Sequence, residues 1–168
     1  VKAFRSTAND INSYIPKGTL PDNIQLPAQL SAKATFKGTL TNFNTNLDLT
    51  SSFGNAVVKA SFDQRKKNRE HYDADIATTG FNIGKLIKND SIGKITLKAK
   101  VKGTGLNPET ATATINGHLV SAEYNHYNYR DLNLKGAINN GQFEATADMS
   151  DPNLDFKLAA NGGFKGKY

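Results

Sequence analysis

The sequence uses one short phrase three times, as Phe36-Lys37-Gly38-Thr39, as Val101-Lys102-Gly103-Thr104 and as Phe164-Lys165-Gly166-Lys167, at spacings of 65 and 63 residues. Each copy closes a run in which apolar and polar residues alternate. Alternation with a period of two is typical of a β-strand that keeps one face in water. The repetition predicts an array of similar β units. Because the third copy comes at the last residues, we expect the chain to be part of a longer array.

Alternation and turn signals continue along most of the chain. Asn139-Asn140-Gly141 is the strongest turn signal, because Asn and Gly accept the positive φ of a type I′ hairpin turn. Gly54-Asn55 predicts another tight turn, Asp151-Pro152-Asn153 a third, and Gly162-Gly163 a break or bulge. The fold is therefore expected to be mainly β, a long antiparallel meander of about ten strands. The apolar positions that coincide after a shift of 65 residues are Leu30, Ala32, Ala34 and Phe36 with Ile95, Leu97, Ala99 and Val101.

Two short helices are expected beside the strands. Asn9-Asp10 offers an N-cap, one helical stripe of apolar residues follows, and Pro16 ends it, which predicts a helix over 9–15. Residues 82–88 have the same apolar pattern and predict a second helix. The chain then divides into a first unit over 1–80 and a second over 81–168 that ends as a third begins. We expect the units to form one continuous body.

Composition and charge exclude several chemistries. The 168 residues include no Cys and no Trp, so disulfides and thiolate ligands are excluded. No apolar run is long enough for a membrane span or a signal peptide, so any anchor is expected outside this sequence. The net charge of +6 invites a nucleic-acid function. However, Lys98, Lys100 and Lys102 alternate with apolar residues and no reading helix accompanies them, so a solvated strand face and no nucleic-acid partner are expected. A weak attraction to anionic lipid headgroups stays open.

A sheet this long has an apolar face that two short helices do not cover. The sheet can close on itself as a flattened sandwich or barrel. Alternatively it can bend into an open groove, a β-taco, whose apolar lining accommodates acyl chains. The residues alone leave both solutions open. The expected lining consists of Leu30, Ala32, Ala34, Phe36, Leu47, Leu49, Phe53, Val58, Phe62, Ile95, Leu97, Val101, Ile115, Leu132, Leu134, Phe143, Leu154, Phe156 and Leu158.

Several segments share strand-end glycines and turn asparagines in a characteristic order. They are Leu26-Pro27-Ala28-Gln29-Leu30 leading into Ala34-Thr35-Phe36-Lys37-Gly38, the stretch 42–56, Phe81-Asn82-Ile83-Gly84-Lys85-Leu86, Lys102-Gly103-Thr104-Gly105-Leu106 and Tyr129-Arg130-Asp131-Leu132. From about Leu20 onward this order resembles the repeats of TamB/AsmA-like envelope proteins. The resemblance implies a periplasmic part of a protein anchored in the inner membrane of a Gram-negative cell. It also implies an apolar β-groove for phospholipid passage, a role in outer-membrane protein assembly, and a possible partner of the Omp85 type.

Catalytic and metal-binding alternatives have little support, so we expect neither an enzyme nor a cofactor. His71, His118 and His126 are the only imidazoles, and no spacing brings three or four metal donors together. Asp148, Asp151 and Asp155 suggest calcium, but the loop motif is absent. The second hypothesis is a closed β-sandwich that binds a protein or glycan through the aromatic strip 124–129.

Overall fold

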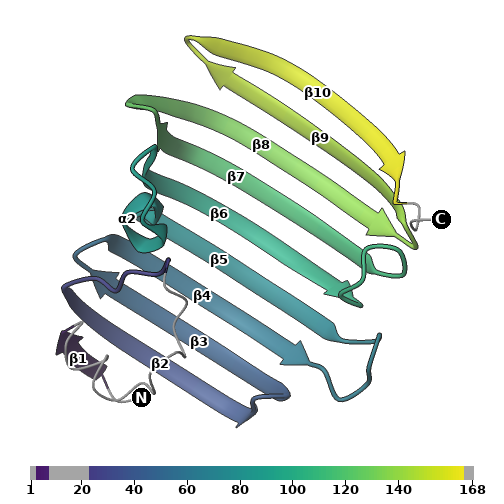
Figure 1. Ribbon diagram of the computed structural model, residues 1–168, viewed down its shortest axis with the longest axis horizontal. Helices are drawn as coiled ribbons and strands as arrows, with labels where there is room; N and C mark the ends of the chain where they lie inside the picture. Colours follow the sequence, from purple (N-terminus) through teal and green to yellow (C-terminus); the bar gives the residue numbers. More distant parts are fainter. Residues whose placement is uncertain (1–2, 8–22, 165–168) are drawn as a thin grey trace.

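The structure, a computed structural model, describes residues 3–7 and 23–164, and these form one antiparallel sheet of ten strands (Figure 1). The strands follow one another across the sheet in chain order, and each pairs with its neighbours in the sequence. The sheet is not closed into a barrel, because β1 and β10 lie at its two edges. The strands are β1 (Ala3–Thr7), β2 (Gln29–Thr39), β3 (Asn42–Ser51), β4 (Gly54–Asp63), β5 (His71–Asn82), β6 (Ile92–Thr104), β7 (Thr112–Tyr124), β8 (Tyr127–Asn139), β9 (Gln142–Asp151) and β10 (Leu154–Gly163). The predicted mainly β meander is confirmed.

The tight turns follow the sequence signals with two exceptions. Asn140 and Gly141 connect β8 to β9 with φ of 46° and 80°, as the type I′ prediction requires. The turn predicted at Gly54-Asn55 is wrong, because Ser51 pairs with Gly54 and the turn residues are 52 and 53. The break predicted at Gly162-Gly163 is also wrong, since the β9–β10 register continues to Gly163.

One short helix, α2 (Ile83–Ile87), connects β5 to β6 and confirms the helix predicted over 82–88. Asn82 caps it, with the side-chain oxygen accepting a hydrogen bond of 2.8 Å from the backbone N–H of Lys85. Lys88 ends it in the left-handed conformation. The helix predicted over 9–15 lies outside the described residues. No helix in the described part of the chain is long and apolar enough to span a membrane.

The repeated phrase recurs at every fourth strand. Its first copy ends β2, its second ends β6, and Phe164 of the third copy directly follows β10. The repeating unit therefore contains four strands. Strands an even number of positions apart in a meander run in the same direction, so β2, β6 and β10 run the same way. The boundary predicted between residues 80 and 81 falls inside β5, and the sheet continues through it.

Very little of this sheet is enclosed by protein. Phe53, Phe81, Ala111 and Met149 are the buried hydrophobic residues of the described chain. The main contacts join each strand to its sheet neighbours and α2 to β6. Hence the side chains on both faces of the sheet are at least partly exposed along most of its length.

Candidate functional site

The strand register gathers the predicted lining residues on one side of the sheet, called here the apolar face. All of them lie on strands except Phe53, which lies in the β3–β4 turn. Val58 pairs with Leu47 on one side and Ile76 on the other, and cross-strand pairs of this kind continue from β2 to β10. Residues of the predicted set remain partly exposed: Phe36 is 53% exposed and Leu158 is 58% exposed.

The predicted set omitted several members of this face. The register adds apolar residues from β5, which the predicted lining did not include, and others from β3, β7, β8 and β9. For Tyr72, Ile76 and Met149 the signal was present, because each lies two residues from an alanine of the same face. The added residues include Phe43, Tyr72, Ile76, Leu119, Ile138 and Met149.

Residues of the apolar face form rows that run across the strands, and side-chain size varies along each row. In one row Phe43 pairs with Phe62 and Phe62 pairs with Tyr72, and the row continues with Gly103 and Ala113 on β6 and β7. Ring centroids lie 5.2 Å apart for Phe36 and Phe43 and 5.8 Å apart for Phe43 and Phe62. The next row runs from β2 to β10 and consists of Phe36, Thr45, Ala60, Ala74, Val101, Ile115, Gly136, Ala145 and Ala160. A third row has Leu47, Val58 and Ile76 on β3 to β5, then Ala99 and Gly117, and then Leu134 on β8.

The aromatic strip 124–129 is partly held by contacts within the sheet. Tyr127 and Tyr129 contact each other edge to face at a centroid distance of 4.7 Å. The hydroxyl of Tyr127 donates a hydrogen bond of 2.6 Å to Asp151. Tyr124 is 50% exposed. The strip is therefore bonded within the sheet at Tyr127, whereas Tyr124, Asn125, His126 and Asn128 are exposed.

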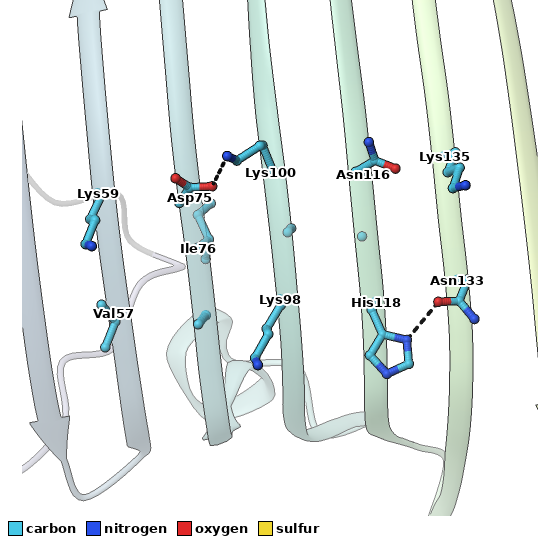
Figure 2. A pocket seen from close by; sticks show the side chains of 13 residues that line it. Val57, Lys59, Asp75, Ile76, Lys98, Lys100, Asn116, His118, Asn133 and Lys135 are labelled. Carbon is cyan, nitrogen blue, oxygen red and sulfur yellow. Dashed lines mark hydrogen bonds and ion pairs between the residues drawn. The ribbon is translucent and has the colours of Figure 1, made fainter.

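The opposite side of the sheet, called here the polar face, contains a hollow of about 540 Å³ over β4 to β8 (Figure 2). This lysine hollow was not predicted. An ion pair of 3.2 Å joins Lys100 to Asp75, and His118 Nδ1 lies 2.8 Å from the side-chain oxygen of Asn133. Its polar lining consists of Lys59, Asp75, Lys98, Lys100, Asn116, His118, Asn133 and Lys135.

Most of the residues considered for metal binding have other partners. His71 Nδ1 lies 2.9 Å from the hydroxyl of Thr104, and Asp148 forms an ion pair of 3.4 Å with Lys157. Asp151 accepts its hydrogen bonds from Tyr127 and from backbone N–H groups. Within residues 3–7 and 23–164, no three His, Asp or Glu side chains are grouped so as to hold a metal ion.

In comparisons with known proteins, no family model, no curated protein and no solved structure matches the chain. The resemblance to TamB/AsmA-like proteins therefore stays a prediction. The two faces of the sheet are the basis for the functional argument.

Proposed function

We propose that the chain is a periplasmic segment of a TamB/AsmA-like protein and that its apolar face is an open β-groove for phospholipid acyl chains. In this role it conducts lipid between the inner and outer membranes and catalyses no reaction. The observation that supports the proposal is the partly exposed apolar face of a sheet whose strands contact mainly their neighbours. Apolar surface of this extent marks a binding surface more often than a solvated one.

The rows of side chains suggest the direction of the acyl path. On β3 to β5 the middle row has Thr45, Ala60 and Ala74 between larger residues on both sides, which leaves a shallow depression there. On β6 and β7, Val101 and Ile115 are larger than the residues on either side. From β2 to β10 this row crosses inter-strand spacings of about 4.8 Å each, roughly 38 Å in all. Lipid moving along this row would travel in the direction in which successive units add strands.

The physical chemistry of burial favours acyl chains on this surface. Each methylene group removed from water contributes about 0.8 kcal/mol, and aliphatic side chains offer no competing polar contact. A phospholipid would keep its headgroup in water at the open side of the groove. Saturated chains of different lengths would fit equally well, because the row has no charged residue to end it.

The other elements of the proposal rest on the resemblance alone. They are the role in outer-membrane protein assembly and an Omp85-type partner. The closed-sandwich alternative has less support, because the main contacts do not join non-neighbouring strands and Tyr127 is bonded to Asp151.

The test is native mass spectrometry of the purified chain after incubation with phospholipid vesicles. Leu47→Asp places an ionised group on the apolar face, where contact with hydrocarbon is costly. Asn46→Asp adds the same charge at the adjacent, exposed position on the polar face. We expect bound phospholipid on the wild type and on Asn46→Asp, and a loss of most of it on Leu47→Asp. Absence of bound lipid on the wild type, or equal binding by both variants, would refute acyl binding by this face.

A further inference from the structure

The lysine hollow differs from the rest of the polar face in its charge balance. Outside it, several lysines lie opposite carboxylates: Lys33 pairs with Asp48 across β2 and β3, and Lys102 pairs with Asp73 across β5 and β6. Inside it, Asp75 is the one acidic residue among four lysines. The lining therefore has an excess of three positive charges.

Two of these lysines have no acidic residue directly opposite them in the sheet. Lys98 lies between Ala77 and His118, and Lys135 lies between Asn116 and Thr146. Neither forms an ion pair with any residue that the structure describes. Both ammonium groups are available to an anion that enters the hollow.

Neutral hydrogen-bonding groups lie between these lysines. Because the side-chain oxygen of Asn133 is an acceptor only, the contact of 2.8 Å requires His118 Nδ1 to donate, which leaves Nε2 unoccupied. The amide groups of Asn116 and Asn133 add donors and acceptors suited to hydroxyl groups. The volume of about 540 Å³ exceeds that of a phosphate ion and is typical of small-molecule sites.

We propose that the lysine hollow binds a phosphorylated polyol. Lys98 and Lys135 contact the phosphate, and Asn116, His118 and Asn133 contact the hydroxyl groups. The same chemistry occurs in a soluble glycerol phosphate and in a glycerophospholipid headgroup. The site lies on the opposite face from the acyl groove and does not depend on it, so either proposal can fail alone.

Calorimetric titration with sn-glycerol 3-phosphate tests the site. Lys98→Gln/Lys135→Gln removes both unpaired charges, and Lys33→Gln/Lys37→Gln removes the same charge from exposed positions of the same face outside the hollow. We expect saturable binding to the wild type, tighter than binding of inorganic phosphate. The first double variant should weaken binding at least about tenfold, and the control double variant less than about twofold.

Vesicles distinguish the two sources of the ligand. Binding to phosphatidylglycerol vesicles but not to free glycerol phosphate, lost only in Lys98→Gln/Lys135→Gln, would assign the headgroup. Binding of the free compound with the same dependence would assign a soluble ligand. Equal weakening in both double variants would show non-specific attraction and overturn the proposal. Failure of the wild type to bind either probe would also overturn it.

Discussion

At the scale of single residues, Asp151 is the charged side chain that the sheet encloses most fully. It is 4% exposed and is the one charged residue buried within the described chain. Its carboxylate accepts hydrogen bonds from the Tyr127 hydroxyl and from the backbone N–H groups of Arg130 and Asn153, at 2.6, 2.9 and 2.9 Å. These bonds, the Tyr127 bond foremost, lower the pKa of Asp151 and tie the start of β8 to the β9–β10 turn.

This lowered pKa predicts sensitivity to acid. An Asp whose pKa in the folded state lies below its unfolded value of about 3.9 stabilises the fold above that pH. Its contribution is lost as the pH falls through the folded value. Tyr127→Phe removes the main cause of the shift, so we expect a lower melting temperature at pH 7 and a smaller further decrease down to pH 2.

Thermal melts of the wild type and variants between pH 7 and pH 2 provide the measurement. Tyr124→Phe is the matched control, because Tyr124 is 50% exposed, and it should follow the wild type at every pH. Identical pH profiles for the two variants would contradict this role of Asp151. The neighbouring Arg65 also lowers the pKa of Asp63, to about 2. The protonation of Asp63 changes stability in the same direction in the wild type and in both variants.

At the scale of elements, the β3–β4 hairpin meets the end of β5 at two glycines. Gly54 has a φ of 120°, and a Cβ on it would lie 2.4 Å from the carbonyl oxygen of Gly80. Gly80 also has a positive φ, of 55°, but a Cβ there would meet nothing within 4 Å. The two positions therefore separate backbone strain from steric overlap.

Alanine substitutions test this close approach. Gly80→Ala should lower the free energy of unfolding by about 1–2 kcal/mol, since the left-handed conformation is its only penalty. Gly54→Ala should cost more than about 3 kcal/mol, because overlap with the backbone of β5 is added to a less favourable φ. Urea unfolding of the two variants measures the difference, and equal losses would show that the hairpin can move away from β5.

The elements also show where sequence reasoning succeeded and where it failed. Strand positions were predictable because each face keeps one kind of residue over many strands. Gly54 was interpreted as a turn residue, and it does adopt a positive φ, but at the first residue of β4. Gly162 was interpreted as a break; instead it leaves room for Phe143, whose ring would lie 2.7 Å from a Cβ. Both glycines are required by residues that are distant in sequence, and a local sequence pattern does not contain those residues.

At the scale of the whole molecule, the apolar face was largely predictable and the lysine hollow was not. Alternation alone assigns a residue such as Val101 to a face. The lysine hollow depends on which residues lie opposite one another over five strands, for example Lys98 beside Ala77 and His118. Turn lengths and bulges set that register, and the pairing of β6 with β7 shifts between Thr96 and Leu97, beside this region.

The acyl groove predicts an effect in cells. Val101→Asp or Leu134→Asp, introduced into the protein as the cell makes it, should weaken the outer-membrane barrier while the sheet stays folded. Leu134 is 36% exposed, so an aspartate there keeps access to water in the absence of lipid. Thr114→Asp adds the same charge on the polar face and should leave the barrier intact.

Detergent sensitivity and thermal melts separate the possible causes. Sensitive cells with folded variants agree with a blocked acyl path. Folded variants with an intact barrier would contradict lipid conduction along this face. If the aspartates lower the free energy of unfolding by roughly 3–5 kcal/mol, these side chains lie in a closed interior and the open-groove proposal is wrong.

Contacts that join mainly adjacent strands also determine how the sheet comes apart. A body of this kind has no central core whose loss releases every element at once, so its stability is a sum over neighbouring pairs. The pairs of β6 with β7 and β7 with β8 join strands of 13 residues each, whereas β10 has a partner on one side only. Amide hydrogens should therefore exchange in a gradient, fastest in the outermost strands and slowest in β7, as the sheet opens strand by strand from its edges.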